Sequence, residues 1–276
     1  MRENYVMLLG MIVKDPEITF DLDKYGNKTY RTGTVKVRTC REIVKSNKDG
    51  EETEINRWDH ITLFTKNEDL IRRDLLVLMK GDLVRVKGTI STSEVIRRHV
   101  CQKCKYLNEY PGINMYVDPL SVHAVASGLS DEDITLILKD ARFCSNIVHL
   151  AGFVTMEPQL HTSREPPYTE VLEFAIAGNR IRRILEDEDT KRTDFPWIKL
   201  YGSLAKKYKD ELSTGCEIYL DGSIQKREPE ILRKCERCGE EGFEQTEIME
   251  VVPDTIMIIR YPEDTEETTL YQRRDK

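Results

Sequence analysis

The chain has 276 residues, of which 39% are hydrophobic and 33% charged, and its formal net charge is −7. This length supports one large core or two ordinary ones, and no apolar run approaches the roughly 20 residues that a membrane-spanning helix needs. The negative charge argues against simple electrostatic capture of nucleic acid. However, residues 1–128 carry a net charge of +3 and the remainder −10, and a mildly basic part joined to an acidic part is compatible with a nucleic-acid partner.

The first residues, MRENYVMLLGMIVKDPE, do not resemble a signal peptide, because their apolar stretch runs into charged residues without a cleavage site of small residues. We therefore expect a cytoplasmic protein with no membrane partner. Its seven cysteines are then expected to be thiols or metal ligands rather than disulfides.

The first elements in chain order are predicted strands. Apolar residues alternate in four short segments, which contain Val6 and Leu8, Val35 and Val37, Ile61 and Leu63, and Leu83, Val84 and Val86. A period of two predicts half-buried strands of an antiparallel sheet.

A helix is predicted between the third and fourth segments, in NEDLIRRDLLVLMKGD. Asn67 can cap its start and Gly81 can end it. The apolar residues at helical spacing are Leu70, Ile71, Leu75, Leu78 and Met79.

Residues 97–106, RRHVCQKCKY, contain the pair Cys101 and Cys104, and no further Cys or His occurs at metal-ligand spacing for many residues downstream. Such a pair can be a redox centre, half of a metal site or two unrelated thiols. Further along, LSDEDITLILKDARF begins with Ser130 and three acidic residues, which predicts the start of a helix that links the segments on either side of it.

The rest of the chain repeats its first part. NYVMLLGMIVKDPEI (4–18) aligns without a gap with NIVHLAGFVTMEPQL (146–160), ITLF (61–64) with IKLY (198–201), and KGDLVRVKGTI (80–90) with TGCEIYLDGSI (214–224). From there a constant offset of 134 residues places Cys235 and Cys238 on the first cysteine pair. We therefore infer two copies of one module.

Three strands, a helix and two strands joined by a long hairpin is the order of an OB-fold, a small Greek-key barrel. The predicted fold class is all-β with minor helices: two tandem OB-fold barrels joined by a helical linker. We expect the first domain over residues 1–128, the linker over 129–143, the second domain over 144–262 and a charged tail over 263–276.

The sequence resembles the bacterial and phage single-stranded DNA-binding protein family. The residues that carry the resemblance are Asn4, Gly10 and DPE (15–17), RWDHITLF (57–64) and MKGDLVRVKGTI (79–90), in the family's order. The resemblance implies that Trp58 and Phe64 are platforms on which bases stack. The chain departs from the family in carrying two barrels, and the segment YQRRDK does not match the family's acidic, Phe-tipped tail.

Binding single strands without sequence choice needs exposed rings and cations that follow the phosphates. The outward parity of Trp58 and Phe64, opposite to Ile61 and Leu63, favours exposure, although core packing remains the alternative for every ring. The candidate residues are Tyr30, Arg31, Arg38, Arg41, Arg57, Trp58, Phe64, Arg72 and Arg73 in the first module and Arg182, Arg183, Trp197, Lys199 and Tyr201 in the second. From the charge balance we expect the first module to dominate, so Trp58→Ala should weaken binding more than Trp197→Ala.

The two cysteine pairs have the form of zinc knuckles, and a structural zinc site takes four ligands. The duplication predicts that Cys101, Cys104, Cys235 and Cys238 hold one shared zinc ion where the two long hairpins meet. Two alternatives remain open: separate ions completed by another chain or by His99, and a thiol redox pair.

No nucleotide-binding loop, acidic metal cluster or activated nucleophile is recognisable, so we expect a binding protein and not an enzyme. The predicted function is to protect or deliver single-stranded DNA in replication, recombination or DNA transfer of a bacterial or phage genome. The alternative is a protein-interaction scaffold that docks on replication proteins and holds nucleic acid weakly. Two chains could still pair as a homodimer, and RNA remains open as the ligand.

Overall fold

The structure is a computed structural model, and it describes all residues except 1–2, 47–51, 163–168, 180–192 and 263–276. The first half contains β1 (Asn4–Ile12), β2 (Glu17–Leu22), β3 (Lys28–Ser46), β4 (Glu52–Thr65), α1 (Glu68–Leu70), the π-helical turn η1 (Ile71–Leu75), β5 (Leu83–Val100) and β6 (Leu107–Ala126). After α2 (Asp131–Asp140), the second half contains β7 (Asn146–Val154), β8 (Gln159–Thr162), β9 (Glu170–Asn179), β10 (Thr193–Asp194), β11 (Trp197–Tyr201), α3 (Ser203–Tyr208), β12 (Glu217–Arg227), β13 (Glu230–Lys234), β14 (Glu241–Gln245) and β15 (Ile248–Arg260).

Each half closes into a five-stranded barrel. In the first barrel the pairing runs β1–β5–β6–β4–β3 and returns to β1, with β4 and β6 parallel. In the second barrel it runs β7–β12–β15–β11–β9 and returns to β7, with β11 and β15 parallel. The predicted fold class, two tandem OB-fold barrels joined by a helix, is confirmed; the predicted domain bounds stay predictions.

The duplication is visible in individual hydrogen bonds. The side chain of Asn4 donates to the carbonyl of Ile90 and accepts from its amide, at 2.8 and 2.7 Å. Asn146 makes the same two bonds with Ile224, at 2.8 and 2.9 Å. Each asparagine side chain is buried, and each ties the first strand of its barrel to the strand that begins a long hairpin.

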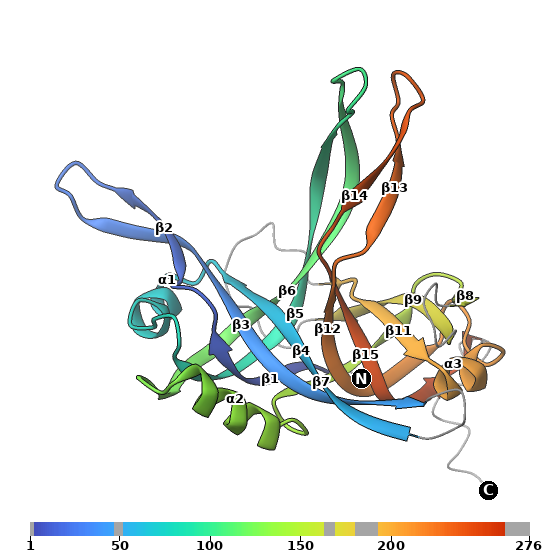
Figure 1. Cartoon of the computed structure of the whole chain (residues 1–276), viewed down its shortest axis with the longest axis horizontal. Helices are drawn as coiled ribbons and strands as arrows, with labels where there is room; N and C mark the ends of the chain where they lie inside the picture. The colour runs from blue at the N-terminus through green and yellow to red at the C-terminus, as the bar shows by residue number, and fades with distance from the viewer. Residues whose placement is uncertain (1–2, 47–51, 163–168, 180–192, 263–276) are drawn as a thin grey trace, which may run out of the picture.

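The two barrels join through β1 and β7, which pair antiparallel with Val6 opposite Val148. These valines are equivalent in the two copies, so the pairing is centred on a pseudo-twofold axis. Most buried apolar side chains of both barrels form one continuous core. The symmetric joint sends the two long hairpins out on the same side of the molecule, where they lie next to each other (Figure 1).

The helices follow the sequence signals with one difference. Asn67 caps α1 by accepting from the amide of Leu70 at 3.0 Å, and Ser130 caps α2 by accepting from the amide of Asp133 at 3.1 Å. Met79, predicted on the apolar face of the first helix, is 62% exposed. The helical segment ends at Leu75, so Met79 lies beyond it, in the turn that leads to Gly81 with its φ of +90°.

The first hairpin has an additional strand that the sequence did not indicate. β2 pairs with the first part of β3, and the two strands project from the first barrel as a separate hairpin (Figure 1). No helix among the described residues is long and apolar enough to cross a membrane.

Candidate functional site

The four paired cysteines lie at the tips of the two long hairpins. Cys101 and Cys104 occupy the turn between β5 and β6, and Cys235 and Cys238 the turn between β13 and β14. In the first turn, the amide of Lys105 donates to the carbonyl of Cys101 at 3.0 Å; in the second, the amide of Gly239 donates to that of Cys235 at 2.9 Å. The two turns therefore have the same fold and present two sulfurs each.

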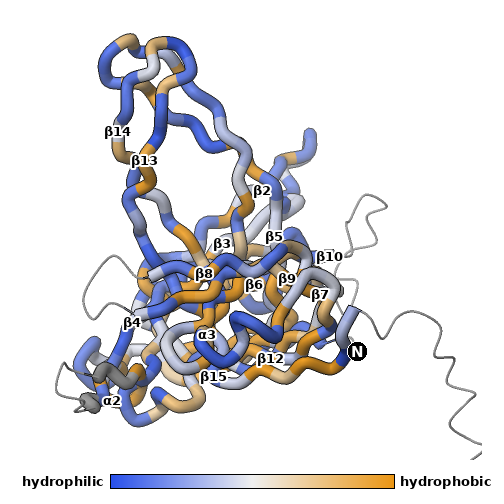
Figure 2. The backbone as a smooth tube through the Cα atoms, turned by 90° about the vertical axis from the view of Figure 1, so that its right-hand side faces the viewer, coloured by the Kyte–Doolittle hydropathy of each residue, from blue (hydrophilic) through white to orange (hydrophobic). Residues whose placement is uncertain are grey.

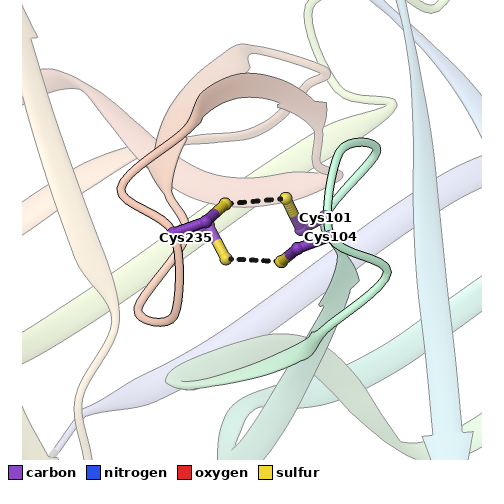
Figure 3. A group of neighbouring side chains, drawn as sticks. Cys101, Cys104 and Cys235 are labelled. Atoms are coloured by element: carbon purple, nitrogen blue, oxygen red, sulfur yellow. Dashed lines mark hydrogen bonds between the residues drawn. The ribbon is translucent and has the colours of Figure 1, made fainter.

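The four sulfur atoms come together in one group, which we call the cysteine junction (Figure 3). The Sγ atoms of Cys101 and Cys238 are 3.7 Å apart, those of Cys104 and Cys235 are 3.6 Å apart, and all four lie within 4.8 Å of one another. Zn–S bonds of about 2.3 Å in a tetrahedron place sulfur atoms about 3.8 Å apart. The geometry therefore fits one tetrahedral metal ion, with two ligands from each hairpin.

The thiols perturb one another. A hydrogen bond from the backbone amide of Cys104 lowers the pKa of Cys101. The amide of Glu240 lowers the pKa of Cys238, but desolvation and the three neighbouring sulfurs outweigh it and raise this pKa to about 12. Four thiolates this close together need a cation to be stable, which agrees with the spacing of the sulfurs.

Other contacts hold the two tips together beside the cysteines. The hydroxyl of Tyr110 donates to the carbonyl of Lys234 at 3.0 Å, and the guanidinium of Arg233 lies 4.6 Å from the centre of the Tyr110 ring. The amide of Glu236 donates to the side-chain oxygen of Asn108 at 2.9 Å. The tips are therefore in direct contact before any metal is considered.

Two cavities lie below the tips, between the hairpins and the barrels. The larger has a volume of about 740 Å³ and is lined by both hairpins together with Phe195, Trp197 and Lys199 of the second barrel. The smaller, of about 530 Å³, faces the first barrel and is lined by Thr62, Phe64 and Tyr116. Ligand cavities in proteins are typically about 300–1,000 Å³, so both could accept bases or side chains of a partner.

The rings predicted to bind nucleic acid in the first barrel are half-buried. Ile61 and Leu63 point into the core as expected, and Phe64 faces outward, edge-on to Tyr116 with ring centres 5.2 Å apart. Trp58 also lies on the outer face, but it packs against the small hydrophobic cluster that includes α2. Arg38 lies 5.0 Å from the centre of the Trp58 ring, so part of this ring is already covered.

Arg41 was predicted to be a surface cation, but its side chain is buried between the two barrels. It is 7% exposed, pairs with Asp59 at 2.6 Å and donates to Gln225 of the second barrel at 2.6 Å. The amide of Lys226 also donates to Asp59, at 3.0 Å. These bonds favour a structural role at the joint between the barrels, and we leave Arg41 out of the proposed interface.

The remaining cations predicted in the first barrel already have acidic neighbours. Arg31 pairs with Asp21, Arg72 with Glu68 and Arg73 with Asp74, each at 2.6 Å, and Arg57 lies 3.7 Å from Asp59. Arg72 also covers the ring of Tyr30, with 4.8 Å between the guanidinium carbon and the ring centre. Phosphates would have to compete with these carboxylates, so each arginine contributes less than its formal charge suggests.

In the second barrel, Trp197, Lys199 and Tyr201 share the outer face of β11. Trp197 is half-buried at the larger cavity. Lys199 is 8% exposed and pairs with Glu173 and Glu250; desolvation lowers its pKa. Burial raises the pKa of Tyr201. Arg182 and Arg183, also predicted here, lie outside the described residues.

The structure corrects the alignment of ITLF with IKLY by two residues. Leu63 pairs with Val117 in β6, and Ile198 pairs with Val251, the residue 134 positions later in β15. Ile198 is therefore the counterpart of Leu63, and Trp197 corresponds to Thr62 rather than to a residue near Trp58. A pattern of period two keeps its inward and outward faces after a shift of two, so hydrophobicity alone could not detect the error.

Sequence reasoning missed several residues at the cavities. Phe195, 38% exposed, and Tyr116 each contribute a ring, and Arg97 and Arg233 contribute cations from the hairpins. Phe195 and Trp197 flank a proline just before a strand, which could have indicated a second ring at this site. The positions of the arginines depend on how the two hairpins meet, and no local pattern reports that.

Comparison with known proteins gives a family match for the second barrel and a fold for the whole chain. Residues 145–237 match the family described as the single-strand binding protein family. A comparison with curated proteins gave no match.

Two solved structures are similar over almost the whole chain. A deletion variant of the single-stranded DNA binding protein from Thermus aquaticus has a TM-score of 0.54 and 16% identity, and the match covers 96% of this chain and 98% of that one. For the wild-type protein the TM-score is 0.53, the identity 17% and the coverage 95% of each chain. The predicted resemblance is thus confirmed: the second barrel matches the single-strand binding protein family, and the whole chain has the tandem OB-fold architecture of these structures.

Proposed function

We propose that this protein binds single-stranded DNA without sequence choice. The observation that carries the proposal is the position of Trp197: its half-buried ring lies at the larger cavity, within the segment that matches the family. The similar proteins from Thermus aquaticus are described as single-stranded DNA binding proteins, which supports the same ligand class here. Base stacking on an aromatic ring tolerates every base and is worth about 1–3 kcal/mol per base.

The electrostatic contribution is expected to be moderate. Many surface cations, such as Arg31, Arg72 and Arg73, are paired with carboxylates, and the net charge is −7. Stacking should therefore contribute more to affinity than phosphate contacts, and the salt dependence should be shallower than for a strongly basic groove. We infer a role in protecting or delivering single strands in replication, recombination or DNA transfer, by binding and not by catalysis.

We further propose that the cysteine junction holds one structural Zn²⁺ ion. Four thiolates in a tetrahedron are a common structural zinc site, and none of the four positions would be left open for catalysis. The ion would fix the two hairpins at their tips and neutralise part of the thiolate charge.

Fluorescence titration tests the DNA-binding proposal, because the chain has two tryptophans, Trp58 and Trp197. A dT oligonucleotide should quench the emission, duplex DNA should not, and the quenching should weaken as salt rises. The variants Trp58→Phe and Trp197→Phe each leave one reporter and assign the signal. No quenching together with no retention of dT at low salt would reject the proposal.

A protein-docking scaffold is the second candidate. The hairpins expose apolar side chains, among them Ile96, Leu232 and Phe243, at 65%, 53% and 67% exposure. Exposed apolar groups of this kind often contact proteins. Failure of the fluorescence titration to detect DNA binding would favour this function.

A further inference from the structure

The two long hairpins border an opening, which is the larger cavity described above. We call the outer part of the β5–β6 hairpin (residues 93–114) the first arm and residues 226–248 the second arm. Both arms leave the barrels separately and meet again at their tips (Figure 2), and residues of both arms line the larger cavity between them. The barrels close the opening below and the cysteine junction closes it above, so its border is a complete ring of protein.

The closure at the top does not rest on the sulfurs alone. The contacts of Tyr110 with Arg233 and Lys234, and of Asn108 with Glu236, lie just below the tips. At the bottom, β6 and β15 are in contact. The space between these two contacts is where the larger cavity lies, since residues of both arms line it.

The lining of the opening suits the bases of a single strand. Trp197 and Phe195 provide rings at the floor. Ile96 and Ile113, 65% and 40% exposed, provide apolar surface on the first arm. Side chains this exposed and apolar are stabilised when bases cover them.

Each of the two arms contributes a cation to the lining of the opening. Arg97 of the first arm and Arg233 of the second line the same cavity. Arg233 pairs with Glu244 at 3.1 Å, whereas Arg97 has no ion pair among the described residues and donates to Asn114 at 3.4 Å. A phosphate backbone passing between the arms would therefore meet a guanidinium on each side.

We propose that a single strand of DNA passes through this opening, so that the cysteine junction closes over it. The inference rests on the proposed function and adds the path of the strand. A strand on an open face leaves directly once its stacking and phosphate contacts break. A strand inside a closed ring leaves only by sliding to an end or by opening of the junction.

The test uses the zinc-loaded full chain and dT oligonucleotides biotinylated at one end or at both ends. The complex forms at low salt, streptavidin is then added to block the biotinylated ends, and the salt is raised to about 1 M NaCl, where the Debye length is about 3 Å. Salt at this level weakens the phosphate contacts, and an excess of unlabelled dT, added at the same time, captures the protein molecules that leave. We expect the protein to stay on the doubly blocked strand and to leave the singly blocked one.

Equal release from both strands would overturn the closed path while leaving the proposed function intact, because binding at low salt is measured in the same experiment. Absence of binding at low salt would reject the function and the path together. The double variant Cys104→Ser/Cys238→Ser should bind at low salt but lose its retention on the doubly blocked strand, because the polar contacts that remain beside the junction are hydrogen bonds that open and re-form. Cys144→Ser is the matched control, since Cys144 is exposed and outside the junction, and it should be retained.

Zinc removal from the unmodified protein with a chelator breaks the cysteine junction without a substitution. It should abolish retention while circular dichroism shows that the barrels remain folded. Retention that persists after chelation, or in the double variant, would mean that the junction does not close the path.

Discussion

Glu250 is a buried carboxylate that pairs with two cations and also lines the larger cavity. The substitution Glu250→Gln therefore tests both the stability of the fold and the binding of DNA. Its carboxylate is 1% exposed and accepts two bonds from Arg227, at 2.6 and 2.8 Å, and one from Gln225 at 2.8 Å. Lys199 lies 3.5 Å away. Glutamine preserves the size of the side chain but removes the charge that compensates these two cations, of which Lys199 is buried and Arg227 is half-buried.

The expected loss of unfolding free energy depends on how much compensation remains. Removing one partner of a buried ion pair typically costs about 3–5 kcal/mol. Here Lys199 keeps Glu173 as a partner, and the side chain of Arg227 is 30% exposed, so water can solvate part of it. We therefore expect a loss near the lower limit, about 3 kcal/mol.

Urea denaturation, followed by circular dichroism, measures this loss. Glu109→Gln is the matched control: Glu109 pairs with Arg98 at 2.9 Å, but the two side chains are 48% and 66% exposed, so its loss should be at most about 1 kcal/mol. A loss for Glu250→Gln no larger than that of the control would refute the reasoning. The same variant should bind dT more tightly than the unmodified protein if the cavity is the binding site, because Arg227 then faces the strand without a competing carboxylate, while Lys199 keeps Glu173.

Three further predictions concern the metal, the rings and the duplicated asparagines. The purified protein should hold one zinc per chain by elemental analysis, Cys238→Ser should lose it and Cys144→Ser should keep it; two ions per chain would contradict the shared site. Trp197→Ala should weaken dT binding by about 5- to 150-fold, and more than Trp58→Ala does, because Arg38 and α2 already cover part of Trp58. This order is opposite to the one that charge balance alone suggests, and equal losses would contradict both. Asn146→Ala should lower the unfolding free energy by about 1–3 kcal/mol or more, because it leaves the buried amide and carbonyl of Ile224 unpaired; thermal unfolding would measure it, and a neutral result would show that water replaces both bonds.

The fold was predictable because duplication acts as an internal alignment. The constant offset of 134 residues placed two cysteine pairs in equivalent hairpins, and closed barrels of the same fold must present those hairpins in equivalent ways. The joint between the copies became visible only in the structure. Nothing in the local sequence says that β1 pairs with β7, and it is this pairing that brings the two tips together.

The nucleic-acid residues were harder to predict because exposure depends on tertiary partners. Outward parity identified Trp58 and Phe64 correctly as residues of the outer face, yet it could not reveal that the linker helix packs beside Trp58. Arg41 reads as a surface cation, but the second barrel supplies Gln225 and buries it. Period-two patterning also leaves register undetermined by two residues, which is why IKLY (198–201) was aligned with ITLF (61–64) two residues out of register.

The fused joint between β1 and β7 removes a constraint that identical subunits must obey. When two separate copies of one chain assemble, every residue occurs on both sides of the axis. Here the two sides are encoded independently, and they have diverged: Thr62 and Phe64 correspond to Trp197 and Lys199, and Tyr116 corresponds to Glu250. With both barrels in one chain, one half presents aromatic side chains and the other combines a ring with a charged network, so the two halves of the molecule differ as those of a symmetric dimer cannot.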